Sequence, residues 1–283
     1  MTLPTSTARS QPGSSQGQFI DWLAHLPWWL LFMLLAGVIL TFAIFSDDLY
    51  SLIFSKLQNG ILTTLSVTVV AYLIAVLLGL LGGLGRVSKN PLIYNLATLY
   101  VQVIRGVPIL VQIFYFAFVI TPGVVGLLNA LGEAINPGGL LASLDNQDIP
   151  MLARLVTALA FAYGGFEAET FRAGIESIGR GQMEAARSLG MSYLQAMRYV
   201  ILPQAIRRIL PPLGNDFVSM LKDSSLVSVL GVRDITQEAR LYMAASFIYP
   251  PTLNMLAFLY LSMTLVLSLV VKWIETRMGK SGH

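Results

Sequence analysis

The chain has 283 residues, of which 55% are hydrophobic and only 12% are charged, and its mean hydropathy is +0.69. Soluble domains carry roughly 25% charged residues, so this composition excludes an ordinary soluble globule and predicts an integral membrane protein. The chain contains no Cys, and its two histidines, His25 and His283, lie near opposite ends. Disulfides are therefore excluded, and neither a histidine-based metal site nor a Ser-His catalytic pair is expected.

Six apolar runs approach the ~20 residues that cross a bilayer as a helix. They predict an all-α, polytopic transmembrane bundle of about six spans, at residues 28–45, 60–83, 92–120, 151–170, 204–230 and 253–273. Residues 1–18 are rich in Ser, Thr, Gln, Pro and Gly and are expected to form a disordered leader. The first run is interpreted as a retained helix rather than a signal peptide, because Asp21 precedes it and no small-x-small cleavage site follows Phe45.

The distribution of basic residues predicts the orientation of the chain. With both termini in the cytoplasm, the outer segments hold only Lys56, Arg154, Arg233 and Arg240, and the long loop 121–150 has no Lys or Arg. The remaining basic residues, apart from Lys222 inside a span, fall on the inner side. This asymmetry follows the positive-inside rule and places the loop 171–203 in the cytoplasm. It also explains the net charge of +3 without nucleic-acid binding.

The loop 171–203 contains the signals for two short helices. The first is expected over about 182–189, with Glu184 in its first turn and Gly190 as a left-handed terminating residue. The second begins at Ser192, where Gln195 completes a capping box, and is expected to end at Pro203. Such a helix pair forms a compact knob, which either docks in a partner's groove or rests on anionic headgroups.

Polar residues inside the apolar runs need a protein or water partner, because ionisable groups are costly in lipid. Five of them share an arc of roughly 120° on the fifth run and form a candidate substrate pathway: Asn215, Asp216, Ser219, Lys222 and Asp223. The alternative is that Lys222 pairs with Asp216 or Asp223 to join helices. Gln112 on the third run is a further pathway candidate, with an interhelical hydrogen bond as its alternative.

A ladder of charges at the inner end of the fourth run is interpreted as structural. Its members lie three or four residues apart, and Glu176 with Arg180 has the favourable direction for an ion pair: Glu169, Arg172, Glu176 and Arg180. Gly79 and Gly83 in the second run are expected to permit close helix packing.

The cytoplasmic loop resembles the EAA loop of permeases from ATP-binding-cassette importers. The matching residues are Glu184, Ala185, Ala186, Gly190, Leu202 and Pro203, with Val200 where the family pattern has Ile. Three further segments resemble the histidine/glutamine-type, polar amino-acid branch of that family. They are Arg105-Gly-Val-Pro-Ile-Leu-Val-Gln112, with Val107 replacing Thr, then Glu169-Thr-Phe-Arg172-Ala-Gly-Ile175 and Leu221-Lys-Asp-Ser-Ser-Leu226.

The resemblance implies a permease domain over 60–276, preceded by an extra helix and outer loop at 19–59 and followed by a cytoplasmic tail at 277–283. It implies a multi-pass protein of the cell inner membrane that translocates polar amino acids and is not an enzyme. The implied partners are an ATPase dimer, a second permease, an extracytoplasmic amino-acid-binding protein and membrane lipids. ATP and Mg²⁺ would bind the ATPase, and no cofactor or nucleic acid is expected on this chain.

Two rival functions are weighed against this one. A self-sufficient secondary transporter of small polar solutes would need ion-coupling groups and usually an internal inverted repeat, which is not evident. A membrane enzyme would need a nucleophile with a base, and the sequence has neither Gly-x-Ser-x-Gly nor His-Glu-x-x-His. Gly279-Lys-Ser281 is not a nucleotide loop, because Ile274 occupies the place of the leading glycine.

Overall fold

A computed structural model describes residues 28–280 and gives side-chain surroundings for residues 35–277. The chain divides into two compact units, Met1–Ser51 and Leu52–His283. The first contains α2 (Trp28–Ser46), an apolar helix whose Thr41 hydroxyl donates to the Gly37 carbonyl at 2.8 Å. Helix α3 (Asp48–Leu57) crosses the boundary between the units. The expected leader at 1–18 lies outside the described residues.

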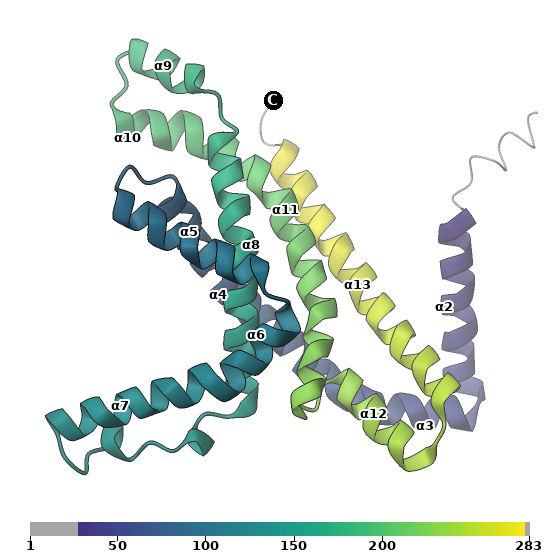
Figure 1. Cartoon of the computed structure of the whole chain (residues 1–283). Helices are drawn as coiled ribbons and strands as arrows, with labels where there is room; N and C mark the ends of the chain where they lie inside the picture. Colours follow the sequence, from purple (N-terminus) through teal and green to yellow (C-terminus); the bar gives the residue numbers. More distant parts are fainter. Residues whose placement is uncertain (1–27, 281–283) are drawn as a thin grey trace, which may run out of the picture. The chain divides into compact units, whose positions relative to one another are not determined.

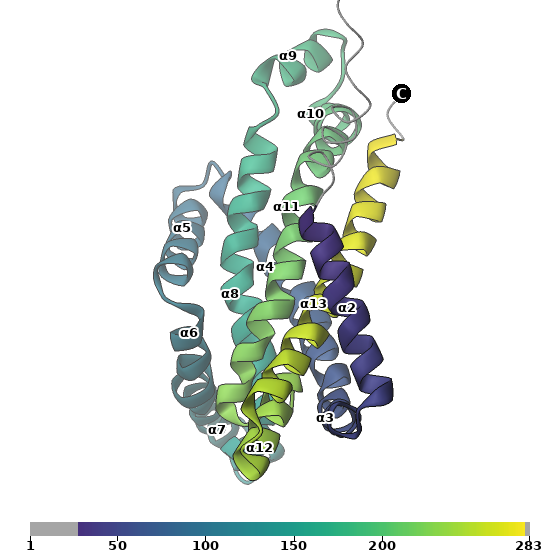
Figure 2. The same ribbon diagram turned by 90° about the vertical axis from the view of Figure 1, so that its right-hand side faces the viewer.

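All regular secondary structure in the described part of the second unit is helical, which confirms the all-α prediction. Its main helices are α4 (Ile61–Arg86), α5 (Pro91–Gly106), α6 (Ile109–Tyr115), α7 (Thr121–Ile135), α8 (Met151–Glu176), α9 (Arg180–Ser188), α10 (Tyr193–Ala196), α11 (Leu202–Asp223), α12 (Ile235–Ser246) and α13 (Tyr249–Lys280). Within this unit α9 and α10 lie at one end, and α7 and α12 lie at the other (Figures 1 and 2).

Helices α4 and α8 form the centre of this unit, because glycines let their backbones approach closely. A Cβ added to Gly79 would lie 2.3 Å from the Cβ of Glu167, and one added to Gly83 would lie 2.6 Å from that of Phe171. The expected packing role of this glycine pair is therefore confirmed. Around the contact, α4, α6, α8 and α11 bury a common apolar core that includes Val67, Ala71, Ile113, Phe116, Leu155, Leu159 and Met220.

Three segments of the described chain are long and apolar enough to cross a membrane by length and composition: Asp48–Arg86, Ile109–Ile135 and Tyr249–Arg277. Helix α8 is also long enough, at 26 residues, but it carries charged side chains. The prediction of a polytopic bundle is confirmed, whereas three of the predicted boundaries differ from the structure.

The first wrong boundary is the third apolar run, which is not one helix over 92–120. The chain breaks at Val107, whose φ of −108° and ψ of 132° are extended, and α6 starts after Pro108. A proline ring disfavours the helical conformation for the residue before it, and here α5 ends at Gly106, directly before the extended Val107.

The second wrong boundary is the start of the expected loop 121–150, which is helical in its first half. Helix α6 continues through a π-helical turn, Phe116–Ile120, directly into α7. Pro122 lies in the first turn of α7, and the wider π turn places the Thr121 amide on the Phe116 carbonyl instead of the usual partner. The same arrangement precedes Pro203, where the π turn Met197–Ile201 links α10 to α11. Pro203 therefore does not end the second loop helix as predicted.

The fifth run also differs from its prediction. Helix α11 contains Pro211 and Pro212 in its interior and ends at Asp223, and residues Ser224–Leu230 form a 3-10 helix closed by Gly231 at φ +76°. Asp234 then caps α12, accepting a hydrogen bond from the Gln237 amide at 2.8 Å. The Ile235 amide donates to the Thr64 hydroxyl at 3.2 Å, which fixes α12 against α4.

Candidate functional site

The knob formed by the loop 171–203 has the local structure that its sequence predicts. Helix α9 ends at Ser188, and Gly190 follows with φ +84°, a backbone conformation that residues other than glycine rarely adopt. Ser192 then caps α10: its hydroxyl accepts the Gln195 amide at 3.3 Å, and the Gln195 side chain accepts the Ser192 amide at 2.8 Å. Both the glycine terminator and the capping box are therefore confirmed.

The knob is attached to the ends of α8 and α11 by an apolar cluster. Ile178, Ile201, Ala205 and Ile209 are buried in it, with Met183 and Met197 packed against them. Ala186 is also buried, whereas Glu184, Ala185, Leu202 and Pro203 are exposed. Leu189 and Leu194, which the motif did not single out, are 81% and 77% exposed. The knob thus presents a small, partly apolar surface, as a protein partner would need.

The capping box leads to a first prediction. Changing Ser192 to Ala removes one amide acceptor, and such changes cost about 1 kcal/mol of helix stability. If the knob docks on the ATPase that the sequence resemblance implies, we expect weaker binding of that ATPase to the purified chain, measured by pull-down at rising ATPase concentration. Changing Ser192 to Asp keeps an acceptor and should restore binding, and equal binding by all three chains would contradict the role of this cap.

The polar stripe of α11 is only partly buried. Asn215 and Lys222 are exposed, while Asp216, Ser219 and Asp223 are half-buried. Among the residues that the structure describes, no ion pair joins Lys222 to either aspartate. Asp223 instead accepts a hydrogen bond from the Tyr163 hydroxyl of α8 at 2.8 Å. The described residues thus show neither of the Lys222 pairs that the alternative interpretation predicted.

A buried carboxylate on α8, Glu167, lies close to these residues of α11. The interpretation of the sequence did not include it. Glu167 has 0% exposure, and neither carboxylate oxygen has a hydrogen-bond partner within the described part of the chain. It lies within electrostatic range of Asp216, and Tyr72 of α4 is beside it. The Tyr72 hydroxyl, however, donates to the Leu213 carbonyl at 2.5 Å. The residues of this buried acid cluster are Tyr72, Tyr163, Glu167, Asp216 and Asp223.

Gln112 lies outside the cluster. It is 5% exposed, and its amide nitrogen donates to the carbonyls of Ile104 at 2.8 Å and Val107 at 2.7 Å. These bonds satisfy acceptors at the end of α5, where the chain breaks before Pro108. The structure thus gives Gln112 the hydrogen-bonding role of its alternative interpretation and brings it to no other candidate pathway residue.

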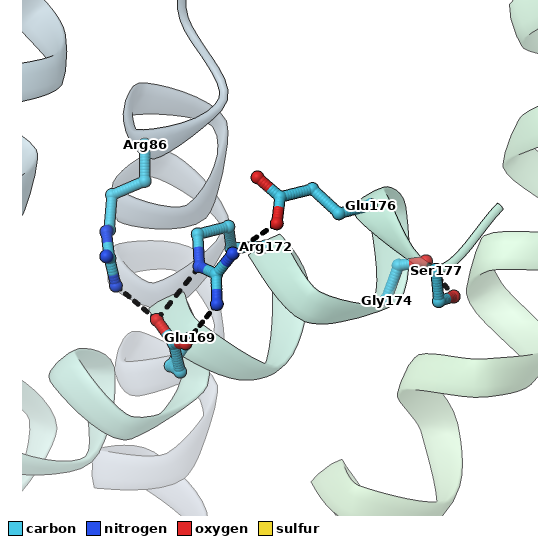
Figure 3. A network of polar contacts seen from close by, with 6 residues as sticks. All are labelled: Arg86, Glu169, Arg172, Gly174, Glu176 and Ser177. Carbon is cyan, nitrogen blue, oxygen red and sulfur yellow. Dashed lines mark hydrogen bonds and ion pairs between the residues drawn. The ribbon is translucent and has the colours of Figure 1, made fainter. Parts of the chain in front are cut away.

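The charge ladder is present at the C-terminal end of α8, with a different partner from the one predicted (Figure 3). Glu169 pairs with Arg172, whose Nε donates at 3.1 Å, and Arg172 also pairs with Glu176. Helix α8 ends at Glu176, so Arg180 belongs to α9 and the predicted pair of Glu176 with Arg180 is absent. In its place Arg86, the last residue of α4, pairs with Glu169.

The comparisons with known proteins identify the class to which this architecture belongs. Residues 75–280 match the family model described as binding-protein-dependent transport system inner membrane component. The chain belongs to this family. It is a permease subunit of an ABC importer, a transport component rather than an enzyme, and the secondary-transporter alternative is not favoured.

Individual relatives agree with the resemblance stated from the motifs. A probable glutamine ABC transporter permease of Bacillus subtilis is 35% identical, over 81% of this chain and 95% of the relative. An arginine transport system permease of Corynebacterium glutamicum is 34% identical, over 80% of this chain and 69% of the relative. Among solved structures, an amino acid ABC transporter with histidines is 38% identical, has a TM-score of 0.67, and covers 82% of this chain and 98% of its own.

A methionine ABC transporter, 18% identical with a TM-score of 0.62 over 79% of this chain and 96% of its own, shares the fold. The described residues contain no group of three or more side chains suited to hold a metal ion.

Proposed function

We propose that this permease carries polar amino acids, that the buried acid cluster binds the positively charged part of the substrate, and that the knob docks on a separate ATPase. The observation that carries the substrate proposal is Glu167, a fully buried side chain whose two oxygens accept no hydrogen bond from the residues that the structure describes. A buried carboxylate is costly unless a cation or donors satisfy it, so a ligand with an ammonium group matches this site.

The neighbouring groups favour an amino acid over a simple cation. Asp216 adds a second acid, and the exposed Asn215 and Lys222 on the same helix can donate to a carboxylate. The relatives transport glutamine and arginine according to their names, and both molecules carry an ammonium group and a carboxylate. Helix α11 therefore offers both an acid for the ammonium group and donors for the carboxylate of such a zwitterion.

The remaining parts of the assembly follow from the family and the charge distribution. We propose that both termini and the knob face the cytoplasm, where the exposed Glu184, Ala185 and Leu189 contact an ATPase dimer. A second permease, identical or related, would complete the pathway, and an extracytoplasmic binding protein would deliver substrate at the end where α7 and α12 lie. Anionic lipids would surround the basic inner segments. ATP and Mg²⁺ would be held by the ATPase, and no nucleic acid is involved.

The test of the substrate site is to change Glu167 to Gln, which keeps the side chain's shape and removes its charge. The chain would be reconstituted in proteoliposomes with its ATPase and binding protein, and uptake of labelled glutamine, histidine and arginine measured. Loss of a hydrogen bond to a charged group predicts a fall of roughly tenfold to a hundredfold in uptake at low substrate concentration. Changing Glu133, an exposed acid of α7, to Gln is the matched control. Uptake by E167Q equal to that of the control would exclude Glu167 from the site.

A further inference from the structure

The ion-pair network of Figure 3 includes one residue from outside α8. Arg86 is the last residue of α4, and its side chain is only 12% exposed where it pairs with Glu169. Glu169 also holds Arg172, which in turn holds Glu176, the last residue of α8. The network therefore runs without interruption from the end of α4 to the point where the chain enters the knob.

The end of α8 is fixed on its other side as well. Arg208 of α11 donates to the Ser177 carbonyl directly after α8, and the apolar cluster around Ile178 and Ile209 seats the knob against both helices. Movement of the knob must therefore displace the ends of α8 and α11 together. The ion pair of Arg86 with Glu169 attaches the end of α4 to these ends of α8 and α11.

Helix α4 leads back to the buried acid cluster. Gly79 packs directly on Glu167, and it precedes Arg86 by about 10 Å of helix. About two turns earlier, the Tyr72 hydroxyl donates to the Leu213 carbonyl of α11, and the Tyr72 ring packs at a tilt against Phe217 with centroids 4.7 Å apart. The same helix thus contacts the knob's support at one end and lines the acid cluster further along.

We infer that Arg86 is a positioning residue for transport: through Glu169 it fixes α4 to the cytoplasmic end of α8, so that a movement of the docked knob reaches the buried acid cluster. This inference rests on the proposed function, because it requires that the knob be moved by an ATPase. An ion pair at the end of a helix is suited to this role, since a charge-assisted contact is stronger and more specific in geometry than the apolar packing that joins α4 and α8 elsewhere.

The test compares Arg86→Gln, Arg86→Lys and Lys89→Gln in the reconstituted complex. The contact uses a single nitrogen of Arg86, so lysine can replace it, whereas glutamine cannot carry the charge. Lys89 is an exposed basic residue just beyond α4, and its change to Gln alters the net charge of that end by the same amount. Three quantities are measured: ATP hydrolysis stimulated by the binding protein, amino acid carried per ATP, and melting temperature in detergent.

We expect R86Q to keep stimulated hydrolysis within about twofold of the unmodified chain while the amino acid carried per ATP falls by roughly three- to tenfold. R86K should recover most of that ratio, and K89Q should leave it unchanged. A proportional fall in hydrolysis and transport, or an unchanged ratio in R86Q, would reduce Arg86 to a structural contact and overturn the inference. Should R86Q fail to assemble, Glu169→Gln removes the same ion pair from the α8 side, and a ratio unchanged in that variant would overturn the inference. If the unmodified complex shows no stimulation, the proposed function itself is wrong.

Discussion

Replacing Gly190 with Val is expected to abolish ATP-driven uptake while the chain still inserts into the membrane. The residue has φ +84°, and a left-handed backbone is unfavourable by about 1–2 kcal/mol for a residue with a side chain, and more for a β-branched one. At this position the Met191 amide donates to the Ala186 carbonyl at 3.2 Å, a bond that closes the end of α9. Valine would open this turn and move α9 relative to α10, so the docking surface would lose its shape.

The design of this experiment uses the space around the glycine. No atom lies within 4 Å of a Cβ added at Gly190, so any effect comes from the backbone and not from a clash. Asn tolerates the left-handed conformation, so G190N should retain most activity. Gly181, in α9, also faces open space but has a helical backbone, which makes G181V the control for added bulk. Binding of the ATPase to G190V as tight as to G181V would show that the knob does not dock.

Local signals in the sequence were sufficient for the knob. Gly190, Ser192 and Gln195 act through hydrogen bonds within a few residues, and such bonds form whatever the rest of the chain does. The all-α membrane fold could likewise be predicted from the sequence, because the length and composition of apolar runs reflect the bilayer rather than tertiary packing.

The helix boundaries near prolines could not be predicted from the sequence in the same way. Pro108 breaks the chain between two helices, whereas Pro122 and Pro203 lie inside continuous ones. The difference is a π turn before each of the last two, which supplies an alternative acceptor for the amide at the junction. Whether a chain bends or breaks at proline depends on what packs beside it, and a single sequence does not contain that information.

The candidate substrate site was predicted in part. The periodicity of α11 placed Asp216 and Asp223 on one polar face, and both belong to the buried acid cluster. Glu167 was missed even though it is an ionisable residue within a predicted span. Like Lys222, it would be costly in lipid without a partner. Its full burial depends on Gly79 of another helix, which is a tertiary property.

Gly79 gives the second large expected effect, because it is where α4 contacts Glu167. A Cβ there would lie 2.3 Å from the Glu167 Cβ and 3.1 Å from its backbone carbon, so relief requires a shift of α8 itself. Overpacking of this kind costs about 1–3 kcal/mol for a modest side chain. We expect G79V to lower the melting temperature in detergent and to abolish uptake, with G79A intermediate in both.

The matched control is Gly126, a helical glycine of α7 with no atom within 4 Å of an added Cβ, so G126V should retain stability and uptake. The two glycine experiments also separate two kinds of failure. Because Gly190 lies in a solvent-facing turn, G190V should lose coupling with little change in melting temperature, whereas G79V should lose both together. A G79V chain that melts like the unmodified one yet transports nothing would mean that α4 and α8 separate during transport, because the added side chain would then obstruct only a closed state.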